Sequence, residues 1–524
     1  MSFISWQYAF LLAGVFALYW LLPWRGRIYL LLGSSYFFYG VWDARFLALL
    51  LASTSLDFFF GLAIAGHRQS LGKLILNAAL PFAWLAGFRL FSGTTTVDNW
   101  ALGIAAAFPF LFALVYSAMW RLQAGQRRRA FLLGAIVTHL GILFFFKYFN
   151  FFAGSLAELL GNFGWQPGWT LLNVILPVGI SFYTFQSIAY AVDVYRGEAE
   201  PPRDFPLYAA YLAFFPQLVA GPIERPNELL PQFQRPAAWL GENFSRGLRL
   251  ILIGLFKKVF VADNCALLAN YAFDPETTLN GWWATLGVLA FAFQIYGDFS
   301  GYTDIARGSA RLFGIQLSRN FFFPYMARGP SDFWQRWHIT LSTWIRDYIY
   351  IPLGGNRGGK WLTMRNLLIA MLLAGLWHGA AWTFVLWGAF HGLLLCLYRL
   401  SPGLKRLETE DYGWRMPVSV AVMFLFTLFG WALFRSPGIG HFTHWLQAFG
   451  NWETSGYVDW IKPGGWLLIH IVPLLLLQWA TAKSRDEIEF THFPWVVREA
   501  GYLILFLLVA TSAVSDAEFI YFQF

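Results

Sequence analysis

Two histidines lie in strongly apolar stretches of the sequence, and both are candidates for chemistry. His338 ends the run 333–338, and His378 follows Gly375, Leu376 and Trp377. A polar ring at membrane depth costs about 1–3 kcal/mol unless it has a partner or faces water, so it indicates function by default. A neutral imidazole, with an ordinary pKa of about 6.5, suits the removal of a hydroxyl proton near pH 7. The two positions point to chemistry inside a membrane.

A third candidate is the glycine-rich, basic loop 354–360, which contains Asn356, Arg357 and Lys360. Backbone N–H groups and cations in such a loop can hold phosphates, so we predict that these three residues bind the phosphates of a donor or cofactor. The spacing does not match that of a P-loop. A plain basic turn on the cytoplasmic side explains the same residues equally well.

The composition predicts the elements that position these residues. Of 524 residues, 58% are hydrophobic and only 13% are charged, whereas soluble domains carry about 25% charged residues. Apolar runs close to the ~20 residues of a membrane-spanning helix recur along the whole chain. Strands of a barrel would instead alternate polar and apolar residues. We predict an all-α polytopic membrane protein with about 11–14 transmembrane helices.

Two stretches, 205–235 and 305–355, are apolar and aromatic but are interrupted by Pro, Gly, Arg and Asp. They are predicted as re-entrant or in-plane helices, because irregular backbone at membrane depth occurs only where it is buried in protein or lines a cavity. We therefore expect a central catalytic cavity. The whole chain, 1–524, is predicted as one domain: N-terminal helices (1–170), a catalytic core (171–398), C-terminal helices (399–514) and an extracytoplasmic aromatic tail (515–524).

The basic residues indicate topology. The formal net charge is +8, but most Lys and Arg fall in alternate loops between the predicted spans. The positive-inside rule then places both termini on the outer side of the membrane. No nucleic-acid partner is expected. Cys265 and Cys396 lie far apart and no group shows metal-ligand spacing, so neither a disulfide framework nor a metal is predicted.

Five motifs in order along the chain resemble those of the membrane-bound O-acyltransferase family, and most closely its bacterial alginate O-acetyltransferase-like branch. They are residues 176–183, 215–223, 294–304, 332–344 and 375–379. The resemblance implies that His378 is the catalytic histidine and that His338 lines the reaction chamber. We assign His378 as general base, and His338 as a residue that polarises the acyl carbonyl or positions the donor. The alternative is that each only donates a hydrogen bond between helices.

The C-terminus carries four aromatic residues within its last six, 519–524. It resembles the terminal motif of small partner peptides in a related D-alanylation system, in which a tyrosine carries the acyl group. The resemblance implies Tyr521 as a third catalytic residue. A phenol is a better leaving group than an alkanol, so its acetyl ester keeps transfer potential. The equally supported alternative is an aromatic anchor at the membrane interface.

The expected function is O-acetyl transfer. The chain would take acetyl groups from a cytoplasmic donor, acetyl-coenzyme A, for O-acetylation of an extracytoplasmic, alginate-like polysaccharide. Its expected partners are membrane lipids, the polysaccharide indirectly, and a periplasmic acetyltransferase resembling SGNH hydrolases. Cellulose or peptidoglycan are alternative substrates. An acyl-carrier transporter or flippase and a non-catalytic scaffold for polysaccharide export are the alternative functions.

Overall fold

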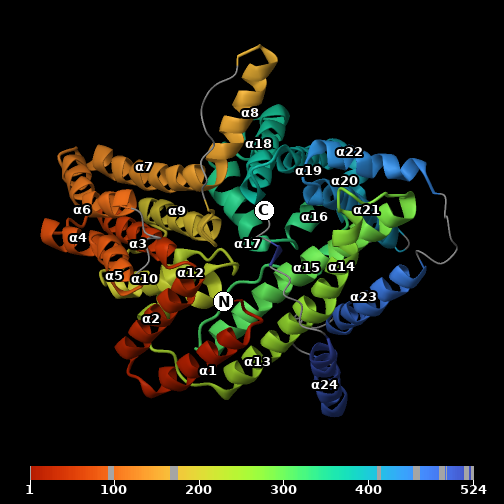
Figure 1. Ribbon diagram of the computed structural model, residues 1–524, viewed down its shortest axis with the longest axis horizontal. Helices are drawn as coiled ribbons and strands as arrows, with labels where there is room; N and C mark the ends of the chain where they lie inside the picture. The colour runs from red at the N-terminus through yellow and green to blue at the C-terminus, as the bar shows by residue number, and fades with distance from the viewer. Residues whose placement is uncertain are drawn as a thin grey trace. The chain divides into compact units, whose positions relative to one another are not determined.

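The structure is a computed structural model. It describes residues 2–92, 99–165, 175–409, 413, 415–452, 461–482, 490, 493–512 and 519–520. Within these ranges every regular element is helical, with no strand. The prediction of an all-α protein is confirmed. Contacts divide the chain into two compact units, Met1–Asn243 with Ser309–Leu317, and Phe244–Gly308 with Ser318–Phe524 (Figure 1).

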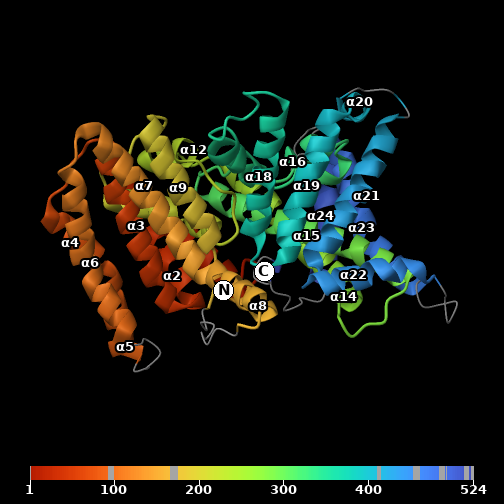
Figure 2. The ribbon, with the colours of Figure 1, turned by 90° about the horizontal axis from the view of Figure 1, so that it is seen from above.

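The first unit is built around one buried helix, α3. Its helices are α1 (Trp6–Leu21), α2 (Trp24–Trp42), α3 (Ala44–Ile64), α4 (Leu71–Ala78), α5 (Leu80–Ser92), α6 (Asn99–Trp120), α7 (Ala124–Leu143), the π-helix η1 (Phe144–Tyr148), α8 (Phe149–Asn162), α9 (Ile180–Arg196), α10 (Phe205–Ala213), α11 (Phe215–Leu218) and α12 (Pro226–Gln234). Helix α3 is 89% buried over its most apolar window. It packs against α7 and α9, and Figure 2 shows α3 and α7 side by side.

The second unit contains the remaining elements. They are α13 (Gly241–Leu255), the π-helix η2 (Phe256–Ala262), α14 (Asp263–Ala272), α15 (Gly281–Leu312), η3 (Pro324–Met326), α16 (Pro330–Trp334), α17 (Ile339–Ile345), the π-helix η4 (Arg346–Tyr350), α18 (Lys360–His378), α19 (Trp382–Leu400), α20 (Pro402–Thr409), α21 (Arg415–Arg435), α22 (Ile439–Gln447), η5 (Ala448–Gly450), α23 (Ile461–Thr481) and α24 (Trp495–Thr511). The boundaries between the units fall within α13 and α15.

Glycines bring α13 and η2 close to α15. A Cβ atom on Gly301 would lie 2.7 Å from the carbonyl oxygen of Gly254, and one on Gly308 would lie 2.6 Å from that of Gly247. Side chains at these points would push the backbones apart, and small residues commonly mediate such contacts between membrane helices. The close approach sets α15 directly against the π-helix η2.

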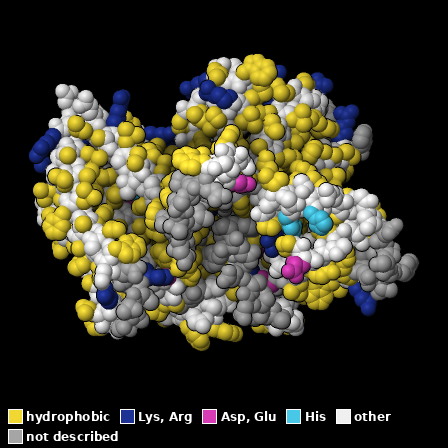
Figure 3. All heavy atoms as spheres, turned by 45° about the horizontal axis from the view of Figure 1, so that its top comes forward, with side chains coloured by type: hydrophobic (Ala, Val, Ile, Leu, Met, Phe, Trp, Pro, Cys, Tyr) yellow, Lys and Arg dark blue, Asp and Glu magenta, His cyan; other side chains and the backbone are white. Residues whose placement is uncertain are grey.

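Among the described residues, seven helical segments are long and apolar enough to cross a membrane: Ala44–Ile64, Leu71–Phe91, Asn99–Trp120, Ala124–Asn162, Trp382–Leu400, Arg415–Arg435 and Ile461–Thr481. Helix α1 is apolar but shorter, at 16 residues. The apolar stretches 248–264 and 282–298 contain charged residues of η2 and α15, among them Lys257, Lys258 and Asp298. Hydrophobic side chains also cover much of the described surface seen in Figure 3. The chain is a multi-pass membrane protein, as predicted.

The two stretches predicted to be interrupted are indeed broken into short helices. Residues 205–235 form α10, α11 and α12, of nine, four and nine residues. Residues 305–355 hold the end of α15 and then η3, α16, α17 and η4, none of which exceeds seven residues. Prolines stand at the start of α10, α11, α12 and α16, where the missing N–H costs no helical hydrogen bond. The predicted division at 171, 399 and 515 remains a prediction.

Candidate active site

The chain segment from α17 to α18 brings the two candidate histidines to one aromatic cluster. His338 immediately precedes α17 and His378 is the last residue of α18. Both are buried, with 0% and 3% of their surfaces exposed. The ring centroid of Trp377 lies 5.7 Å from that of His338 and 5.0 Å from that of His378. Trp377 therefore contacts both His338 and His378, although these two residues lie 40 positions apart in the sequence.

Aromatic rings surround His378. Its ring meets Trp387 edge-on at 5.0 Å and Phe434 at 5.2 Å. Helix α18 reaches this place because Gly375 packs on the backbone of α19, where a Cβ atom would lie 2.2 Å from the carbonyl oxygen of Phe384. Large aromatic walls exclude water, which strengthens any electrostatic interaction made between them.

The backbone of His338 is strained. Its φ of 42° and ψ of 55° lie in the left-handed region, which non-glycine residues seldom adopt. Asn320 holds the turn in place. Its carbonyl oxygen accepts the N–H of Ile339 at 2.9 Å, and its Oδ1 accepts the N–H and hydroxyl of Thr340 at 3.2 and 2.6 Å. Such strain costs about 1–3 kcal/mol and persists where the surroundings fix it, often at functional sites.

The same amide oxygen defines the tautomer of His338. Nδ1 of His338 lies 3.3 Å from Oδ1 of Asn320. Because Thr340 donates two hydrogen bonds to that oxygen, the oxygen is an acceptor and Nδ1 is the donor. In the neutral ring Nε2 is then the basic nitrogen. Polarisation of a carbonyl through Nε2 would require the protonated ring, whereas the neutral ring suits an incoming hydroxyl.

His391, buried on α19, belongs to the same aromatic cluster. Its ring lies 4.7 Å from Trp387, which also touches His378, and 5.2 Å from Trp334.

An ion pair joins Asp332 and Arg336 on the segment before His338, with Nε of Arg336 2.5 Å from Oδ1 of Asp332.

The structure does not bring the glycine-rich loop to the histidines. Lys360 and His378 are the first and last of the 19 residues of α18, so roughly 27 Å separates them along the axis. Asn356, Arg357 and Lys360 are exposed, and Oδ1 of Asn356 accepts a hydrogen bond from the Tyr350 hydroxyl at 2.6 Å. The loop could hold only the far end of an extended donor.

The C-terminal segment packs beside His338. Phe519 is 2% exposed and Ile520 is fully buried. The ring of Phe519 lies 4.1 Å from that of Tyr302 and 6.0 Å from that of Phe299, and Phe299 lies 4.7 Å from His338. Tyr521, the predicted acyl carrier, lies outside the described residues. Phe519, two positions before it, is separated from His338 by one aromatic ring, that of Phe299.

Sequence reasoning missed the buried ions of η2 and α15. Nζ of Lys257 lies 2.9 Å from Oδ2 of Asp304, and Nζ of Lys258 lies 2.9 Å from Oδ1 of Asp298. These lysines were assigned only to a predicted span. Two adjacent lysines in an apolar run are the signal that could have identified them, because intramembrane charges are uncommon without a role.

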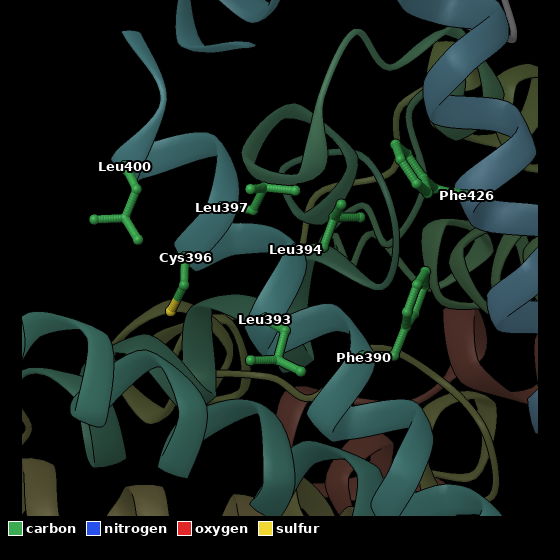
Figure 4. Close-up of a pocket in the computed structure, with 7 residues that line it drawn as sticks. All are labelled: Phe390, Leu393, Leu394, Cys396, Leu397, Leu400 and Phe426. Atoms are coloured by element: carbon green, nitrogen blue, oxygen red, sulfur yellow. The ribbon is translucent and has the colours of Figure 1, made fainter.

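One apolar hollow lies between α19 and α21 (Figure 4), and neither His338 nor His378 is among its lining residues. Its volume is about 430 Å³, and it is lined by Phe390, Leu393, Leu394, Cys396, Leu397, Leu400 and Phe426. No lining side chain could serve as a general base, so the hollow is unsuited to acyl transfer. Among the described residues no group of three or more His, Cys, Asp or Glu could hold a metal ion.

These features define a helical membrane protein with two buried histidines in one aromatic cluster. Comparison with known proteins agrees: residues 201–436 match the model of the membrane-bound O-acyltransferase family. A probable alginate O-acetylase of Pseudomonas putida is 36% identical over 496 residues, covering 90% of this chain and 98% of the relative. A peptidoglycan O-acetyltransferase of Helicobacter pylori is 33% identical over 454 residues, covering 77% and 84%. A teichoic acid D-alanyltransferase of Bacillus subtilis is 25% identical over 323 residues, covering 59% and 78%.

The chain belongs to the membrane-bound O-acyltransferase family. Within it, the chain lies on the branch of the alginate O-acetylases. It is therefore a membrane-bound O-acyltransferase.

Proposed function

We propose that this protein accepts acetyl groups from acetyl-coenzyme A on the cytoplasmic side of a bacterial inner membrane and passes them outward for O-acetylation of an extracytoplasmic polysaccharide. The observation that carries the proposal is the aromatic cluster in which His338 and His378 share Trp377. The alginate O-acetylase relatives support an alginate-like acceptor, and the Helicobacter pylori relative makes peptidoglycan the alternative.

In the proposed first step His378 acts as general base. Its imidazole takes the proton of an attacking hydroxyl while the hydroxyl oxygen bonds to the thioester carbonyl. The carbon–sulfur bond then breaks, and the proton passes to the coenzyme A thiolate. General base catalysis contributes about 100- to 10,000-fold. His338 orients the hydroxyl or the donor through Nε2, because Asn320 occupies Nδ1. Asn356, Arg357 and Lys360 bind the distal phosphates of the donor.

The attacking hydroxyl in this scheme is the phenol of Tyr521. The packing of buried Phe519 on Phe299, which itself contacts His338, supports it. A hydroxyl of a periplasmic partner of SGNH-hydrolase type then attacks the acetyl-tyrosine ester, takes the acetyl group and returns its proton to the phenol. The partner passes the acetyl group to a hydroxyl of the polysaccharide and thereby completes the transfer. Both termini lie on the periplasmic side in this arrangement.

Tyr521→Phe tests the relay, because it keeps the ring and deletes only the nucleophile. We expect polysaccharide acetylation by cells carrying this variant to fall at least 100-fold below that of the parent, within the range that nucleophilic catalysis provides. Phe524→Leu is the matched control and should retain acetylation. Parental acetylation by Tyr521→Phe would mean that the tail is an aromatic anchor only.

A further inference from the structure

A buried ion cluster, which the proposed chemistry does not use, contacts the C-terminal segment. Nζ of Lys258 lies 2.8 Å from Oδ1 of Asp263 and 2.9 Å from Oδ1 of Asp298. The other oxygen of Asp298, Oδ2, accepts the backbone N–H of Ile520 at 2.7 Å. All three ionisable side chains are at most 3% exposed. The two oxygens of Asp298 therefore link the cluster on one side to the tail on the other.

The formal charges of this cluster are unequal. Lys258 carries one positive charge against two carboxylates, so the trio has one surplus negative charge. A neighbouring cluster has the opposite surplus, because Asp304 pairs with both Lys257 and Arg307, at 2.9 and 3.2 Å. A buried carboxylate needs hydrogen-bond donors as well as a counter-ion. The N–H of Ile520 supplies a donor to the carboxylate-rich cluster.

We propose that Asp298 is the docking point of the C-terminal segment and thereby a positioning residue for acyl transfer. The hydrogen bond from the backbone N–H of Ile520 fixes which tail residue lies at Asp298. This register does not depend on the side chains that follow Ile520. In this register Phe519 packs on Tyr302 and Phe299, next to His338. The positioning role rests on the proposed function, in which Tyr521 accepts the acyl group; the docking role does not.

Tail docking is measured directly by carboxypeptidase trimming of the purified full-length protein, followed by mass spectrometry. In the parent, trimming should stall before Ile520. A hydrogen bond to a buried charge is worth about 1.5–3 kcal/mol, or about 10- to 100-fold in a tail-release equilibrium. Asp298→Ala should therefore accelerate removal of Ile520 and Phe519 by about that factor.

Asp304→Asn is the matched control for the ion clusters. It alters a buried aspartate on the same helix, paired with the adjacent lysine, but Asp304 does not contact the tail in the described structure. We expect its trimming rate to equal that of the parent. Equal trimming of the parent and Asp298→Ala would overturn the proposal. So would equal acceleration by Asp304→Asn, because loosening of the helices would then explain the release.

A second pair of variants leaves both ion clusters intact. Ile520→Pro removes the N–H donor itself, whereas Ile520→Val keeps the donor and most of the apolar side chain. Only the proline variant should release the tail and lose acetyl transfer. If Tyr521→Phe stays active while Ile520→Pro releases the tail, docking stands and the relay fails. If Ile520→Pro trims like Ile520→Val, docking itself is wrong.

Discussion

Each unit buries a histidine in apolar surroundings, yet the contacts of the two rings differ. In the first unit Nε2 of His139, on α7, lies 2.5 Å from Oδ1 of Asp57 on α3. The other oxygen of Asp57 accepts the hydroxyl of Ser187, on α9, also at 2.5 Å. In the second unit the ring of His378 packs against Trp377, Trp387 and Phe434.

The difference is that one histidine joins helices, whereas aromatic rings surround the other. The imidazole of His139 contacts a carboxylate that also connects α9 to α3, and the side chains of His139, Asp57 and Ser187 are essentially inaccessible. Aromatic walls instead hold a ring by its shape and keep water away. Burial alone therefore does not distinguish the two histidines, whereas the chemistry of their neighbours does.

The largest effect is expected at His378. His378→Ala should lower acetyl transfer by the purified protein at least 100-fold, because it removes the general base. His139→Asn should keep most of the activity per folded molecule, since His139 lies in the other cluster. Residual transfer above a tenth of the parental rate in His378→Ala would reject the assignment.

In the cluster of His139, Asp57 and Ser187, we expect substitutions to lower the stability of the protein and not its activity. Asp57→Ala removes the acceptor of both His139 and Ser187 and should lower the free energy of unfolding by about 3 kcal/mol. Unfolding in detergent, followed by circular dichroism, measures it. Transfer per folded molecule should remain close to the parental rate. A specific loss of turnover in a stably folded Asp57→Ala protein would show that this cluster also serves catalysis.

His338 should give a smaller catalytic effect, and its backbone allows a clean comparison. Asn tolerates the left-handed conformation better than most residues, so His338→Asn removes the imidazole with little backbone penalty. We expect about a tenfold loss in kcat/KM, less than the loss of a general base would cause, because His338 orients the hydroxyl or the donor and does not take the proton. His338→Ala should lose more stability than His338→Asn. Normal turnover by the Asn variant would leave His338 a structural role only.

The smallest effect is expected at the glycine-rich loop, which lies at the opposite end of α18 from His378. Arg357→Gln and Lys360→Gln should each raise the KM for acetyl-coenzyme A about two- to fivefold, as exposed ionic contacts are worth up to about 1 kcal/mol. Added salt should reduce the difference from the parent. Arg406→Gln, another exposed basic residue, is the control. An unchanged KM in both loop variants favours the plain basic turn.

The fold was more accessible to sequence reasoning than the site. Apolar runs and their interruptions depend on local composition, so they predicted the helical class and the broken stretches 205–235 and 305–355. The meeting of His338 and His378 on Trp377 depends on the turn held by Asn320 and the close packing of α18 on α19. Contacts of this kind, between residues far apart in the chain, cannot be predicted from the spacing of residues in the sequence.

The buried ions were missed for a different reason. Asp57 and Lys258 each lie in an apolar stretch of the sequence, and a single charge at membrane depth is itself a signal of function. Their partners come from other helices, so sequence alone could have flagged these residues but not paired them. Asp298 lies within the motif 294–304, and its contact with Ile520 spans more than two hundred positions.

The π-helix η2 has a consequence for how the two lysines choose their partners. Lys257 and Lys258 are adjacent, and in an α-helix neighbouring side chains diverge by about 100°. Along η2 both reach α15, at Asp304 and Asp298. Deleting one residue between 256 and 262 would restore ordinary α-helical winding. The residues on one side of the deletion would then turn about the helix axis by about 100° relative to those on the other side. The two side chains are chemically identical, so only the winding of the backbone decides which amine pairs with Asp298. That amine is the one connected, through Asp298, to the C-terminal segment.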